Sequence, residues 1–206
     1  LGEKFPEQRA RLEAFAPRLR SALLDKNPKL VNAEADYWLA MLKTDHFAAQ
    51  GKWDSTILWS REMLKTAKQC TEMPNIGTNW FTIWMDGYIN LSYYLILGKW
   101  DEPSALDACI RLVEEATAFL ASKEAGEFYY QNRELLKTNH AHALMLRNGP
   151  GDRDAAIALY RDFYRSYADS RGYDNWELLE KDFRDLKRLG APWPELPELE
   201  AIVRGE

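Results

Sequence analysis

Histidine is the side chain that most often carries acid–base or metal chemistry near neutral pH, and this chain has three: His46, His140 and His142. His140 and His142 are two residues apart, which on a helix places them about 200° apart around the axis, so they cannot bind one metal ion together. Neither the HExxH pattern of zinc proteases nor the ExxH pattern of di-iron bundles occurs. The histidines therefore predict structural or surface roles, and we expect no metal site and no cofactor.

The remaining motifs of common catalytic sites are also missing from the sequence. Cys70 and Cys109 do not form a CxxC pair, and two cysteines are too few for a disulfide framework. The amphipathic spacing around Cys109 predicts a small buried residue, whereas Cys70, near a predicted helix end, is expected to be partly exposed. The glycines match neither GxGxxG nor GxxxxGK[ST], so no phosphate-binding loop is predicted. We expect a chain that is not an enzyme.

Charge and hydropathy exclude further classes. The chain has 27 Lys and Arg against 32 Asp and Glu, a formal net charge of −5, which argues against nucleic acid or an anionic membrane as a partner. Charged or polar residues interrupt every apolar run before the roughly 18 residues that a membrane span needs. The charged opening lacks the apolar core of a signal peptide, and the few cysteines suit a reducing compartment, so we expect a cytoplasmic location.

Helical periodicity runs along almost the whole chain. The clearest example is an apolar stripe preceded by a cap at Asp174 or Asn175 and ended by Gly190. That stripe comprises Trp176, Leu179, Phe183, Leu186 and Leu189. The same spacing predicts about eight helices and no strand. The other strong segments are 33–50, 53–69, 80–97, 103–122, 128–147 and 155–167.

Three of the predicted corners repeat a glycine followed by an aspartate. They are Gly51-Lys52-Trp53-Asp54, Gly98-Lys99-Trp100-Asp101 and Gly151-Asp152-Arg153-Asp154. A recurrence at about fifty residues, with one helical hairpin per unit, is typical of an α-solenoid, in which each hairpin buries its apolar face against the next.

The stretch from Gly151 to Phe163 resembles the turn and second helix of a tetratricopeptide repeat (TPR), with Ala156, Tyr160 and Phe163 at the small and aromatic positions of that family. The units here are longer than the family's repeat of about 34 residues. The resemblance, over about residues 33–170, implies an all-α fold: a right-handed, TPR-like stack of helical hairpins. We expect a single domain, 1–206, with an N-terminal capping helix (5–32), three hairpin units (33–174), and a C-terminal capping helix with an irregular Pro-rich tail (175–206).

In TPR-like arrays the first helices of the units line a concave surface where partner peptides lie. Aromatic residues make up 13% of the chain, and many fall in these first helices. We therefore expect a groove with aromatic anchors and a basic rim, and a scaffold that binds a protein or peptide partner. Two alternatives stay open: a small-molecule sensor or enzyme with a pocket between helices, and an acidic inhibitor such as a bacterial immunity protein. The candidate groove residues are Trp38, Trp84, Tyr88, Tyr130, Arg133 and Lys137.

Overall fold

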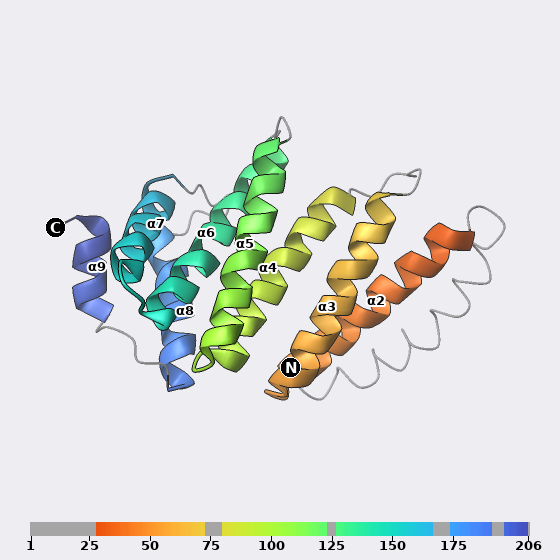
Figure 1. The fold of residues 1–206 in the computed structure, drawn as a ribbon, viewed down its shortest axis with the longest axis horizontal. Coiled ribbons are helices and arrows are strands. Elements are labelled where there is room, and N and C mark those ends of the chain that lie inside the picture. The colour runs from red at the N-terminus through yellow and green to blue at the C-terminus, as the bar shows by residue number, and fades with distance from the viewer. Residues whose placement is uncertain (1–27, 73–79, 123–126, 167–173, 191–195, 206) are drawn as a thin grey trace. The chain divides into compact units, whose positions relative to one another are not determined.

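The fold is all-α. A computed structural model describes residues 28–72, 80–122, 127–166, 174–190 and 196–205, and within these ranges it contains eight helices and no strand (Figure 1). The helices are α2 (Pro28–Ala48), α3 (Trp53–Thr71), α4 (Trp80–Lys99), α5 (Pro103–Ser122), α6 (Glu127–Arg147), α7 (Asp152–Ser166), α8 (Asn175–Arg188) and α9 (Leu196–Arg204). The all-helical class predicted from the periodicity is confirmed, whereas the solenoid stacking stays a prediction. The predicted N-terminal helix before residue 28 lies outside the described residues.

Two helices depart from the prediction at their starts. α2 begins at Pro28 rather than near residue 33, because proline suits the first helical position, where its missing N–H has no partner to lose. α9 occupies part of the segment expected to be an irregular tail. Pro197 is its second residue, still within the first turn, where a proline breaks no intrahelical hydrogen bond. The chain is therefore helical from Leu196 to Arg204, where an irregular tail was expected.

The three repeated corners do not share one geometry. Gly51 and Gly151 have φ of 65° and 81°, in the left-handed region that glycine adopts without a steric cost. Gly98 instead lies inside α4, which continues to Lys99 before the chain turns. The first and third corners thus use their glycine as the sequence pattern predicts, and the second does not.

The described helices group into two compact units, 1–87 and 88–206, with the boundary inside α4. In the first unit α2 packs against α3, and the start of α4 contributes Trp80, whose ring meets Tyr37 edge to face at 5.4 Å. Gly87 lies so close to Leu64 that a Cβ there would be 3.0 Å from a leucine methyl carbon. Close packing of large aromatic and small residues therefore builds this core.

In the second unit α6 packs against both α5 and α7, and α9 packs against α7 and α8. The predicted stripe of α8 is buried as expected at Trp176, Leu179, Phe183 and Leu186, and Asp174 caps the helix by accepting a hydrogen bond from the Trp176 N–H at 3.0 Å. The predicted TPR-like positions Ala156, Tyr160 and Phe163 are also buried. This unit holds the polar cluster described next.

Candidate functional site: a buried polar network and the cleft along α8

The six predicted groove residues do not share one exposed face. Trp38 is 45% exposed, but Trp84 and Tyr88 are only 7% and 3% exposed. The side chains of Tyr130 and Arg133 lie outside the described residues. Trp84 and Tyr88 are thus buried packing residues, and the groove with its six residues stays a prediction.

Their contacts explain the burial. Trp84 is approached by the ammonium of Lys68, 5.6 Å from its ring centre, so it faces α3. The hydroxyl of Tyr88 donates to Glu115 of α5 at 2.6 Å. The two rings thus contact neighbouring helices, Trp84 at α3 and Tyr88 at α5.

Lys137 is also engaged within the fold. Its ammonium lies 2.9 Å from the fully buried carboxylate of Glu134 and 2.5 Å from that of Asp162 on α7. Burial lowers the pKa of Lys137, but the hydrogen bonds to the two carboxylates outweigh it and leave the pKa raised. Lys137 therefore remains charged and ties α6 to α7.

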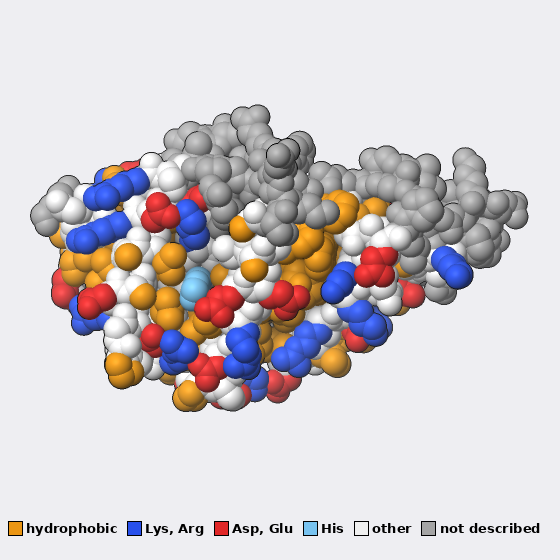
Figure 2. All heavy atoms as spheres, turned by 45° about the horizontal axis from the view of Figure 1, so that its top comes forward, with side chains coloured by type: hydrophobic (Ala, Val, Ile, Leu, Met, Phe, Trp, Pro, Cys, Tyr) orange, Lys and Arg blue, Asp and Glu red, His pale blue; other side chains and the backbone are white. Residues whose placement is uncertain are grey.

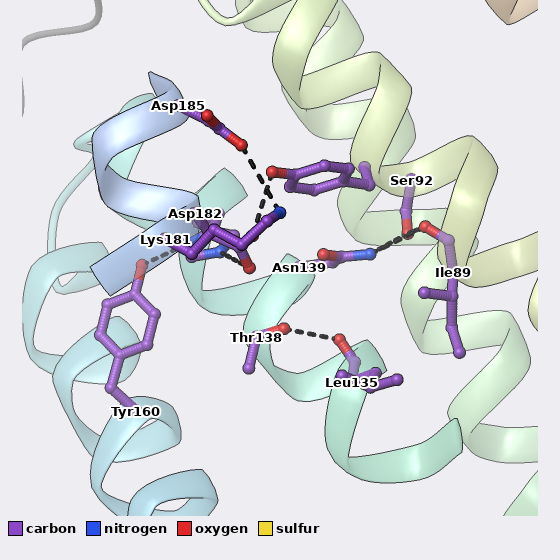
Figure 3. Close-up of polar contacts among 11 residues, drawn as sticks. Ile89, Ser92, Leu135, Thr138, Asn139, Tyr160, Lys181, Asp182 and Asp185 are labelled. Carbon is purple, nitrogen blue, oxygen red and sulfur yellow. Dashed lines mark hydrogen bonds and ion pairs between the residues drawn. The ribbon is translucent and has the colours of Figure 1, made fainter. Parts of the chain in front are cut away.

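A different polar cluster brings four helices together at Asp182 of α8 (Figure 3). The hydroxyl of Tyr93, from α4, donates to one carboxylate oxygen at 3.0 Å. The other oxygen lies 3.4 Å from Nε2 of His142, on α6, whose Nδ1 is 2.8 Å from the hydroxyl of Tyr160 on α7. His142 and Tyr160 are fully buried, while the Asp182 side chain is 24% exposed.

The donors and acceptors of this network run in one direction. An ionised carboxylate only accepts, so Nε2 of His142 carries the proton that points at Asp182. In the neutral imidazole Nδ1 is then an acceptor, and the Tyr160 hydroxyl donates to it. For this neutral tautomer the order of donation is Tyr160 to His142 to Asp182, with Tyr93 donating to the same carboxylate. Asp182 is the acceptor at which both branches end.

Both phenols stay protonated in this setting. Burial, followed by the nearby charge of Asp182, raises the pKa of Tyr93 and that of Tyr160 well above the ordinary tyrosine value. Neither phenol can act as an anionic nucleophile near neutral pH. In contrast to a catalytic triad, in which the histidine faces the substrate, here the histidine is enclosed and the aspartate is the partly exposed member.

A second set of hydrogen bonds fixes α6 against α4 beside this network. The amide of Asn139 donates to the Ser92 hydroxyl at 2.7 Å and to the Ile89 carbonyl at 2.9 Å (Figure 3). Asn139 and Ser92 are buried, so these bonds satisfy polar groups that have no access to water. They leave little freedom for the helices that carry Tyr93 and His142.

The network borders an open cleft of about 760 Å³ along the exposed face of α8. Lys181 belongs to both: its ammonium is 4.0 Å from Asp182 and 3.6 Å from Asp185. Arg184 pairs with Glu180 at 2.6 Å on the same face. The described side chains that line the cleft are all from α8 and include both acidic and basic residues: Glu177, Glu180, Lys181, Arg184, Asp185, Lys187 and Arg188.

The cysteines are unsuited to chemistry. Both are free and buried, with Cys70 only 1% exposed, so the expectation of a partly exposed Cys70 is wrong and the expectation of a buried Cys109 is confirmed. Burial raises the pKa of each thiol to about 12, helped at Cys70 by the negative charge of Glu34. Thiolate would be scarce at either position near neutral pH.

The described ranges bear on two further features, a metal site and a membrane-spanning helix. Within those ranges, no three or more His, Cys, Asp or Glu side chains come together in a way that could hold a metal ion. Among the described helices none combines the length and apolar character needed to cross a bilayer. The positively and negatively charged side chains are interspersed on the face shown in Figure 2.

Sequence reasoning missed Tyr93 and Asp182 as partners. Tyr93 is five residues after Tyr88, and His142 five after Lys137, which turns each side chain about 140° away from the predicted face. The available signal was the charged Asp182 placed directly beside the apolar stripe of α8.

Comparisons with family models, with curated proteins and with solved structures found no match for this chain, so the assignment of a function depends on the geometry above.

Proposed function

We propose that this chain is a non-enzymatic interaction module that binds a segment of a partner protein in the cleft along α8. The observation that carries the proposal is the cleft itself: it is open, about 760 Å³ in volume, and bordered by seven charged side chains of one helix. An open charged wall suits a polar protein segment better than a small apolar ligand, which needs an enclosed, largely apolar pocket.

The rigidity of α8 supports the same proposal. Four large apolar side chains anchor the helix on one side, and Asp182 joins it to α4 and α6 through Tyr93 and His142. A wall held in this way presents its charges in a fixed arrangement, which lowers the entropy lost on binding. The TPR-like resemblance and a cytoplasmic location belong to this proposal, and the two free cysteines suit a reducing compartment.

The alternatives receive less support. A small-molecule pocket between helices would need polar side chains that converge on a ligand, but Lys137 is paired with Glu134 and Asp162 within the fold. An acidic inhibitor would present one localised acidic face, whereas the exposed face of α8 carries four basic and three acidic side chains together.

Site-specific photocrosslinking tests the proposed function. A photoreactive residue in place of Arg184 should crosslink to a partner protein in an extract of the source cells. A photoreactive residue in place of Lys65, an exposed side chain of α3, should not crosslink to the same protein. Charge reversal at Arg184 and Arg188 should weaken capture of that partner, whereas Lys65→Glu should not. Equal crosslinking from positions 184 and 65, or equal capture by all variants, would contradict the proposal.

A further inference from the structure

The C-terminal helix α9 is short, and two of its described aliphatic side chains are buried. It has nine residues, and a helix of this length is marginal in water without tertiary contacts. Leu199 and Val203, four residues apart on one face, are 1% and 0% exposed, and α9 packs against α7 and α8. Among the described side chains of α9, Leu199 and Val203 are therefore the two buried apolar anchors.

A side chain of α7 binds the backbone of α9. The guanidinium of Arg161 donates from Nε to the carbonyl oxygen of Ile202 at 2.8 Å. Ile202 is among the last four residues of α9, whose carbonyls have no donor within the helix. Because this contact is to the backbone, it would be available to any helix that ends at the same place.

Arg204, near the end of α9, contacts residues of α7 and of the start of α8. Arg204 donates to the Tyr164 hydroxyl of α7 at 2.6 Å and to the Asp174 carboxylate, which caps α8, at 3.1 Å. The Arg204 guanidinium lies 5.3 Å from the centre of the Tyr164 ring. The surface formed by α7 and the start of α8 thus contacts two aliphatic side chains, donates one hydrogen bond to a backbone carbonyl through Arg161, and binds one arginine through Tyr164 and Asp174.

We infer that this surface is a helix-binding site, separate from the α8 cleft, which α9 occupies as an internal competitor. Its external ligand is an amphipathic helix of a partner protein with two aliphatic residues four apart and an arginine directly after the second, as in α9. Binding follows the helix-in-groove mode, with the Arg161 side chain capping the end of the bound helix. Because α9 must leave first, its docked population reduces the apparent affinity for the external helix.

A fluorescent peptide with the sequence of residues 195–206 provides the probe, titrated against the full chain by fluorescence anisotropy. The variant Leu199→Ala/Val203→Ala weakens α9 in the chain but leaves the surface of α7 and α8 unchanged. We expect this variant to bind the peptide about tenfold more tightly than the wild-type chain, or better. A further Arg161→Ala change should reverse most of that gain, and a peptide with Leu199→Ala should bind poorly.

Hydrogen exchange of α6 and α7 shows whether the double variant keeps its fold. Arg204→Gln is the milder second variant, because it removes the contacts to Tyr164 and Asp174 and the ion pair with Glu200 inside α9 but leaves both aliphatic anchors in place, and it should shift affinity in the same direction. If a folded variant with increased exchange in α9 binds the peptide no more tightly than the wild-type chain, the inference is wrong. The α8 cleft takes no part in this assay, so its outcome is independent of the proposed function.

Discussion

Replacing Asp182 by alanine should destabilise the second unit by about 2–3 kcal/mol. The carboxylate accepts a hydrogen bond from Tyr93 at 3.0 Å, and a bond to a charged acceptor contributes about 1.5–3 kcal/mol. The contact to His142 is long, at 3.4 Å, and adds less than about 1 kcal/mol. Removal of a partly buried charge returns some desolvation cost, which keeps the sum in this range.

Asp185 is a matched control on the same helix. Its side chain is 26% exposed, against 24% for Asp182, but its ion-pair partners Lys181 and Arg188 are 71% and 78% exposed. Exposed ion pairs contribute about 0.2–1 kcal/mol, so Asp185→Ala should cost less than 1 kcal/mol. The two variants therefore differ in how exposed the lost partners are: Tyr93 is half-buried and His142 is buried, whereas the partners of Asp185 are exposed.

Urea unfolding followed by circular dichroism measures both variants, and hydrogen exchange of α8 locates the effect. The reasoning expects a lower urea midpoint for Asp182→Ala at an unchanged slope, with faster exchange in α8. Equal losses for the two variants would refute it, because the lower exposure of the partners of Asp182 would then have no energetic consequence.

Further predictions concern packing, pH and thiol reactivity. Trp84→Ala should cost about 3–5 kcal/mol in unfolding free energy while partner capture is retained once the protein is folded; weakened capture with unchanged stability would reverse the assignment of Trp84 as a packing residue. The hydrogen bonds from Arg147 lower the pKa of Asp152, and those from the Trp176 N–H and from Arg204 lower the pKa of Asp174. Both carboxylates therefore stabilise the fold at a pH above the ordinary aspartate pKa of about 3.9. This stabilisation is lost as the pH falls through their lowered folded-state pKa values. The stability difference between wild type and Asp152→Asn should accordingly shrink between pH 5 and about pH 2, and a constant difference would contradict this. Cys70 and Cys109 should react with a thiol reagent only as fast as the fold opens, and rapid labelling of native protein would show that a thiol is accessible.

The helices of this chain could be predicted because their apolar residues follow the helical period. In α8 the stripe of Trp176, Leu179, Phe183 and Leu186 has charged residues all around it, so the pattern identifies one buried face, and the structure buries it. The cap at Asp174 was also predicted. One-sided amphipathic helices reveal their orientation because only one face can be buried.

The candidate site could not be predicted in the same way. α4 is apolar around most of its circumference, so its sequence does not say which face meets α3 or α5 and which meets α6. Trp84 and Tyr88 were therefore assigned to a groove, although they pack against other helices. The Asp182 network joins α4, α6, α7 and α8, and contacts of such long sequence separation leave no local pattern.

The one-way order of donors at Asp182 has an evolutionary consequence. Both branches of this network end at the carboxylate of Asp182. A substitution at Asp182 therefore leaves Tyr93 and His142 without their acceptor, and it changes the partner that Tyr160 meets at His142. Descendants of this sequence should exchange these four positions as a set: a lineage that replaces Asp182 with an apolar residue should also replace His142, and then has no reason to keep a hydroxyl at Tyr160. The four positions should therefore change together rather than one at a time.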